Sequence, residues 1–94
     1  MKQLARIELP VEQKGKGSTH HIRNDLNVSG MVCFLRAAKS SDEQVYLFYE
    51  DANGNDLNDL CFLSFGELLW QVANEFTFDV AKMLQADAER RFRQ

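Results

Sequence analysis

Apolar and polar residues alternate in the first part of the chain. In residues 4–13 (LARIELPVEQ), every second position from Ala5 to Val11 is apolar. This period of two predicts a half-buried β-strand, because successive side chains of a strand point to opposite faces. Pro10 has no amide hydrogen to donate to a neighbouring strand. We therefore expect the first strand to lie at an edge of its sheet.

Further apolar runs, separated by turn residues, predict the next strands. Glycines at 15 and 17 predict a turn, and residues 18–23 (STHHIR) then predict a short strand that returns beside the first in a hairpin. Residues 28–38 (VSGMVCFLRAA) are apolar on both faces, as is typical of a central strand. Residues 45–50 (VYLFYE) predict a strand that forms a second hairpin with it.

The segment after residue 50 fits two patterns. Asn53 and Gly54 predict a tight turn, because both residues tolerate positive φ angles. Residues 56–64 (DLNDLCFLS) fit both a strand and one face of a helix. We favour the strand, because Ser64 and Glu67 form an S-x-x-E capping box that predicts a helix start directly after it.

Residues 65–93 contain no proline and carry apolar side chains at helical spacing. Thr77, followed by Asp79, predicts the start of a second helix, because a short acceptor side chain and an early acid both favour a helix N-terminus. We expect two helices that meet at Thr77, and one bent helix is the alternative.

Strands followed by helices predict an α+β fold. We expect residues 1–94 to form a single α+β domain, with an antiparallel β-meander of four to five strands and two C-terminal helices packed on one face of the sheet. Hydrophobic residues make up 45% and charged residues 27% of the chain, which is typical of globular rather than disordered proteins. Neither a signal-peptide pattern nor a run near the ~20 apolar residues of a membrane span is present, so we expect a cytoplasmic protein.

Charge is segregated along the chain. Residues 1–39 carry seven Lys or Arg and three acids, residues 40–81 carry nine acids and no basic residue or His, and residues 82–94 carry four Lys or Arg and two acids. An acidic block repels a phosphate backbone unless the fold turns it away. The acids either lie on solvated edges or form a surface for a protein partner. The candidate partner-binding residues are Asp42, Glu43, Glu50, Asp51, Asp56 and Asp59.

No motif in the sequence predicts a cofactor, a metal or catalysis. Residues 15–25 (GKGSTHHIRND) lack the G-x-x-x-x-G-K-[ST] order of a phosphate-binding loop. His20 and His21 are adjacent, so on a strand they point to opposite faces and cannot chelate one ion. Residues 51–59 lack the glycine and glutamate spacing of a calcium loop. Cys33 lies in an apolar run, where a reactive thiolate is disfavoured. We therefore expect no enzyme.

The leading hypothesis is a protein-binding domain of the inhibitor, immunity or regulatory type, a profile shared by small acidic proteins of mobile elements. Ten aromatic residues and the acidic block support it. The alternative is a nucleic-acid-associated regulator, although Tyr46 and Phe48, which resemble base-stacking aromatics, are better explained by core packing. The basic residues that would serve this alternative are Lys14, Lys16, Arg23, Arg90, Arg91 and Arg93.

The helical segment carries more apolar side chains than one stripe can hold. Trp70, Val80 and Met83 look surplus to a stripe that covers the sheet. A surplus apolar stripe predicts a contact with another chain, and a symmetric homodimer is the commonest way to bury it. The alternative is that the two helices pack on each other and hide these residues within one chain.

Overall fold

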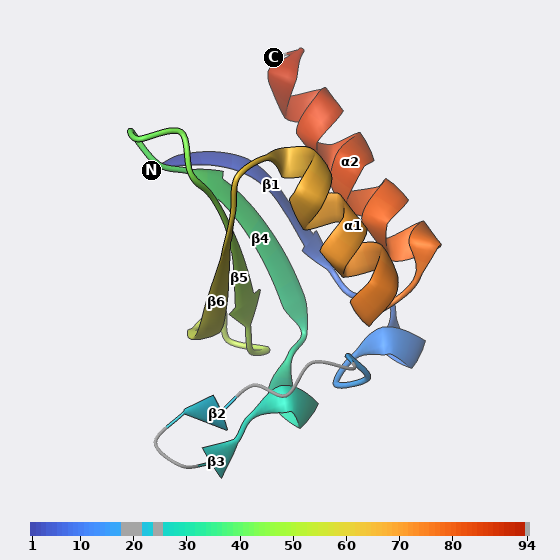
Figure 1. The fold of residues 1–94 in the computed structure, drawn as a ribbon. Helices are drawn as coiled ribbons and strands as arrows, with labels where there is room; N and C mark the ends of the chain where they lie inside the picture. Colours follow the sequence, from blue (N-terminus) through green and yellow to red (C-terminus); the bar gives the residue numbers. More distant parts are fainter. Residues whose placement is uncertain (18–21, 24–25, 94) are drawn as a thin grey trace.

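The computed structural model describes residues 1–17, 22–23 and 26–93, and it contains an antiparallel sheet covered on one face by two helices (Figure 1). The predicted α+β class is confirmed. The main strands are β1 (Lys2–Glu8), β4 (Phe34–Lys39), β5 (Val45–Glu50) and β6 (Asp56–Phe62), in the order β1-β4-β5-β6. The smaller elements are 3-10 helices η1 (Val11–Gln13) and η2 (Ser29–Met31) and the strand pair β2 (Ile22–Arg23) and β3 (Leu26–Asn27). The helices are α1 (Phe65–Glu75) and α2 (Phe78–Phe92).

The first strand pairs with a different partner from the predicted one. β1 lies at the edge of the sheet, as predicted, but its neighbour is β4, where Ile7 is opposite Leu35. β2 pairs with β3 instead, so the predicted hairpin between the first strand and residues 18–23 is wrong; residues 18–21 lie outside the described part. The reason is length: β4 pairs with β1 at six positions, whereas β2 has only two residues to pair.

Two strands are shorter than the alternation predicts. β1 ends before Pro10, and the chain turns into η1, so Val11 is exposed rather than on the buried face. β4 begins at Phe34, because η2 interrupts the predicted strand of residues 28–38. Val28 and Val32, on either side of η2, are nevertheless buried and extend the core beyond the end of the sheet.

Local turn and capping signals are confirmed. The β5–β6 turn has Gly54 at φ +81°, with the Gly54 amide donating to the Asp51 carbonyl. α1 begins after Ser64, whose hydroxyl accepts from the Glu67 amide at 3.2 Å. The Glu67 carboxylate accepts from the amide of Leu63 at 3.1 Å, so it reaches the residue before the cap rather than Ser64 itself.

The second helix starts where its cap predicts. The hydroxyl of Thr77 accepts from the amide of Val80 at 3.2 Å, and Asp79 lies in the first turn of α2. Residues 65–92 therefore form two helices rather than one bent helix, and both lie on the same face of the sheet (Figure 1).

The core lies between the helices and the face of the sheet that they cover. Val80 is 1% exposed and belongs to this core, so its assignment to a surplus outer stripe is wrong, because α2 turns that position toward the sheet. Trp70 and Met83 remain exposed, at 69% and 39%. The core side chains include Ala5, Ile7, Leu9, Leu35, Ala37, Val45, Leu47, Tyr49, Leu68, Val72, Val80, Ala81 and Leu84.

Candidate functional site

An open groove lies at the end of the molecule where both termini emerge (Figure 1). Its volume is about 1160 Å³, and four segments form it: the start of β1, the β4–β5 turn with its flanking residues, the start of α1 and the last turns of α2. We call it the terminal groove. Its lining residues are Lys2, Gln3, Leu4, Lys39, Glu43, Val45, Leu63, Ser64, Phe65, Gln85, Ala88, Glu89, Arg91, Phe92 and Arg93.

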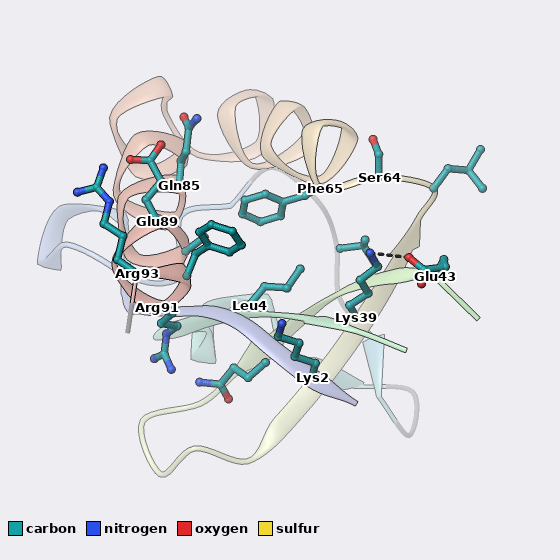
Figure 2. Close-up of a pocket in the computed structure, with 15 residues that line it drawn as sticks. Lys2, Leu4, Lys39, Glu43, Ser64, Phe65, Gln85, Glu89, Arg91 and Arg93 are labelled. Carbon is teal, nitrogen blue, oxygen red and sulfur yellow. Dashed lines mark ion pairs between the residues drawn. The ribbon is translucent and has the colours of Figure 1, made fainter. Parts of the chain in front are cut away.

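The floor of the terminal groove is apolar. The β1–β4 register shifts between Gln3 and Ala5, which leaves Leu4 out of the strand ladder at a β-bulge. Figure 2 shows Leu4 and Phe65 pointing into the same hollow from β1 and from the start of α1. Leu4 and Phe65 are half-buried and pack against the core. The floor is therefore an open extension of the hydrophobic core.

Two large apolar side chains of the groove lining are open to solvent. Leu63 precedes the helix cap, a position that often packs back on the fourth helical residue, here Leu68, yet it is 75% exposed. Phe92 ends α2, which extends beyond α1 at this end of the molecule, and it is 89% exposed (Figure 1). Both side chains are apolar surface that this chain leaves uncovered.

Charged residues surround this apolar surface. Lys2 and Lys39 are opposite each other on the β1–β4 ladder, and Arg91 and Arg93 lie at the end of α2. Figure 2 shows Lys39 paired with Glu43 across the β4–β5 turn. The lining holds four cations and two carboxylates, a net charge of 4 − 2 = +2. Within the described residues, Lys2 and Arg93 have no ion-pair partner.

Asp87 fixes the α2 wall of the groove against the edge of the sheet. Its carboxylate accepts from the backbone amide of Arg6 at 2.8 Å, from Arg91 Nε at 2.7 Å and from Arg90 Nη2 at 2.8 Å. Burial alone would raise the pKa of Asp87, but the hydrogen bonds from Arg91, the Arg6 amide and Arg90 lower it to about 2. The same contact gives a hydrogen-bond acceptor to the Arg6 amide, which would otherwise lack one because β1 is at the edge of the sheet.

The structure does not gather the six predicted acidic residues into one surface. Glu50 is only 3% exposed, so its assignment to an acidic surface is wrong. Its two carboxylate oxygens accept from Arg6 Nε at 2.9 Å and from Arg36 Nε at 2.8 Å, on the face of the sheet that the helices leave uncovered. Arg36 also pairs with Asp56 at 3.1 Å.

Of the remaining predicted acids, Asp42 and Glu43 lie in the β4–β5 turn, Asp51 in the β5–β6 turn and Asp59 within β6. Asp42 accepts from Ser40 within the β4–β5 turn, and Asp51 accepts from the amides of Asn53 and Asn55 at 2.9 Å within the β5–β6 turn. These carboxylates thus stabilise their own turns. Asp59 is exposed on β6. Of the six predicted acids, Glu43 lines the terminal groove.

The uncovered face of the sheet carries arginines stacked on aromatic rings. The guanidinium of Arg6 lies 4.2 Å from the ring centroid of Phe34, and that of Arg36 lies 4.1 Å from Phe48. Tyr46 stacks on Phe48 with their centroids 6.2 Å apart. Tyr46 and Phe48 therefore lie outside the core, which corrects their interpretation as core residues. The arginines cover ring faces that a base would need for stacking.

The basic residues of the nucleic-acid alternative lie at opposite ends of α2. Gly17, the neighbour of Lys16, is packed against Glu75, just before α2 begins. Arg91, near the end of α2, lies 3.2 Å from the side-chain amide of Gln3. A helix of 15 residues is about 22 Å long. Lys14 is paired with Glu8. The side chain of Arg23 and both histidines, His20 and His21, lie outside the described residues.

The two cysteines are free thiols in different surroundings. Cys33 is half-buried, whereas Cys61 is exposed and its thiol donates to the side-chain oxygen of Gln44 at 3.1 Å. Both cysteines lie in apolar runs of the sequence, where burial is the usual expectation for a free thiol, and the exposure of Cys61 corrects that expectation. The described residues contain no cluster of three His, Cys, Asp or Glu side chains able to hold a metal ion. In the same part of the chain, no helix has the length and apolar character needed to cross a membrane.

Comparison of the chain with family models, curated proteins and solved structures finds no match. Any functional conclusion therefore depends on the geometry of the molecule itself. Sequence reasoning missed the terminal groove, although Phe92 is visible in the sequence as an apolar residue among the C-terminal arginines.

Proposed function

We propose that this protein is a protein-binding domain that receives a polypeptide segment of its partner in the terminal groove. The observation that carries the proposal is the exposure of Leu63 (75%) and Phe92 (89%) beside a floor continuous with the core. Apolar surface gathered in a concave site marks a place where another molecule excludes water. Peptide-recognition domains use such grooves to hold apolar anchor residues.

The composition of the groove supports a protein partner over nucleic acid. An apolar floor made by Leu4 and Phe65 offers no donor to a phosphate, whereas it fits the apolar side chains of a polypeptide. The basic residues near position 16 lie at the start of α2, and Arg90, Arg91 and Arg93 lie at its end. They therefore share no common face that a nucleic acid could bind. We propose that the protein belongs to the inhibitory, immunity or regulatory class of binding proteins. A small domain of this kind acts by binding a segment of its partner and making that segment inaccessible.

The proposal is tested by capture from an extract of the source cell, with the protein coupled to beads through the exposed thiol of Cys61. We expect the wild type to retain a specific protein. Phe92→Asp is expected to lose it, because a carboxylate replaces the exposed anchor of the groove. Phe78→Asp is the matched control, since Phe78 is also an exposed aromatic residue of α2 (66%) but does not line the groove.

The comparison between variants decides the result. Circular dichroism first establishes that both variants keep the fold of the wild type. Retention of the same protein by all three forms would show that the groove is not the binding site. Loss with Phe78→Asp and retention with Phe92→Asp would assign binding to the start of α2 and overturn the proposal.

A further inference from the structure

The charges of the terminal groove specify the chemistry of what it binds. We infer that its occupant is an acidic amphipathic polypeptide segment, with apolar side chains facing the floor and carboxylates on both flanks. This inference rests on the proposed function and adds the partner's chemical class.

The apolar half of the inference comes from the shape of the α2 wall. Gln85 lies three residues before Ala88 and four before Glu89, and Phe92 lies four and three residues after these two, so the four side chains share one face of the helix. The groove therefore runs beside the last two turns of α2, with Leu4 opposite this face. A segment with apolar residues on one side fits such a channel in the manner of a helix in a groove.

The acidic half comes from the position of the cations. Lys2 lies at the start of β1 and Arg93 just after α2, on opposite walls of the groove, and neither has an ion-pair partner among the described residues. The carboxylate of Glu43 is already paired with Lys39. Carboxylates on both flanks of the occupant would thus meet unpaired cations, whereas a basic segment would meet like charge.

The same observations separate this occupant from two others. A second copy of the chain, docked by a two-fold axis, would set the +2 lining against itself. An anionic bilayer would match the cations and the exposed Leu63 and Phe92, but a flat surface does not enter the hollow that contains Leu4 and Phe65. A polypeptide segment both fills the hollow and supplies the carboxylates.

The test uses two fluorescein-labelled peptides of about 14 residues, long enough for four helical turns. One has leucine on one helical face and glutamate on its flanks, and the other has lysine in place of every glutamate. The full chain is titrated into each while fluorescence anisotropy is recorded. We expect the glutamate peptide to bind at least about tenfold more tightly than the lysine peptide, and to weaken as salt is added.

Variants locate the effect in the groove. The double variant Lys2→Ala/Arg93→Ala is expected to weaken binding of the glutamate peptide about five- to tenfold and to reduce its salt dependence. Lys82→Ala is the matched control, because Lys82 is an exposed cation of α2 that lies over Phe78 and does not line the groove. Both cation variants are expected to unfold in urea at the wild-type midpoint.

Each other outcome overturns the inference. Equal affinity for the two peptides would reject acidic recognition and leave the proposed function standing, since extract capture judges that separately. Binding of neither peptide would reject an amphipathic segment as occupant. Binding to phosphatidylserine vesicles that Phe92→Asp abolishes would assign the groove to a membrane, and a dimer that Phe92→Asp dissolves would assign it to a second copy.

Discussion

At the scale of single residues, Glu50 is a buried carboxylate whose charge depends on its neighbours. It is buried between Arg6 and Arg36, and each guanidinium is also stacked on an aromatic ring of the uncovered sheet face. A buried carboxylate is stable only when its partners compensate for lost hydration, so removal of one member leaves the others poorly paired. The sequence shows Glu50 only as one acid in an acidic block, and its burial depends on two arginines from other strands.

Glu50→Ala is therefore expected to lower the free energy of unfolding by about 2–3 kcal/mol, because Arg6 and Arg36 lose their common acceptor while solvent still reaches both guanidiniums. Urea unfolding measures the change. Asp59→Ala, which removes an exposed acid from the neighbouring strand, is the control and should stay within about 0.5 kcal/mol of the wild type. Equal losses in the two variants would contradict a special role for Glu50.

Tyr49 and Glu75 form a second buried polar contact, in which the tyrosine hydroxyl donates to the carboxylate. Tyr49→Phe is expected to cost about 1–2 kcal/mol at neutral pH, because the buried carboxylate loses a donor. Tyr46→Phe, on the opposite face of the same strand, should change stability by less than about 0.5 kcal/mol. A Tyr49→Phe protein as stable as wild type would show that other donors to Glu75 suffice.

The same contact predicts a dependence on alkaline pH. Burial, followed by the charge of Glu75, raises the pKa of Tyr49 above its ordinary value of 10.0. The folded state then keeps Tyr49 neutral while the unfolded chain ionises, so its stabilising contribution is complete below pH 10 and decreases as pH rises further. The midpoint of urea unfolding should therefore fall less between pH 7 and about pH 11 in Tyr49→Phe than in the wild type.

At the scale of helices and strands, signals carried by neighbouring residues predicted structure well. The starts of α1 and α2 follow from Ser64, Glu67 and Thr77, whose side chains bond to amides within four residues. The pairing of β1 could not be predicted in this way. Alternation shows that a segment is a strand, but its partner is decided by contacts with residues far along the chain, here Ile7 with Leu35.

The terminal groove was beyond sequence reasoning for the same physical reason. Its lining comes from four segments that only the finished fold brings together. Leu4 enters it through a β-bulge, and period-two alternation gives no sign of an extra residue in a strand. Phe92 looks like a continuation of the α2 stripe until the structure shows that α2 extends beyond α1 (Figure 1).

The attachment of α2 to β1 predicts an acid dependence. Because the pKa of Asp87 is lowered to about 2 in the folded state, its stabilisation is complete above about pH 4 and decreases as pH falls toward 2. Asp87→Asn is expected to cost about 1–2 kcal/mol at neutral pH and to flatten the loss of stability between about pH 4 and pH 2. The exposed Glu89→Gln, on the same helix, is the control.

Hydrogen exchange provides a local measure of the same change. The amide of Arg6 donates to Asp87 and should exchange faster in Asp87→Asn, whereas amides of β5 should exchange at the wild-type rate until the whole protein unfolds. Unchanged exchange at Arg6 would show that the carboxylate does not hold α2 on the edge of the sheet.

At the scale of the whole molecule, the predicted homodimer now depends on Trp70 and Met83, since Val80 is in the core. These two exposed residues lie on the helices rather than in the groove lining. We expect light scattering at tens of micromolar to give twice the 10.8 kDa of one chain, and Trp70→Glu to return it to a monomer with its fold intact. A wild-type mass near one chain would contradict the prediction.

Both ends of the chain emerge beside the terminal groove, and this has a practical consequence for how the protein is handled (Figure 1). An affinity tag or fused reporter at either end would sit over the mouth of the groove and compete with the bound segment. The β5–β6 turn, at the far end of the sheet, is exposed at Ala52 and Asn53 and does not line the groove, so we expect an insertion there to leave the lining untouched. A short tag placed there should leave peptide affinity at the untagged value, whereas the same tag after the last residue should weaken it.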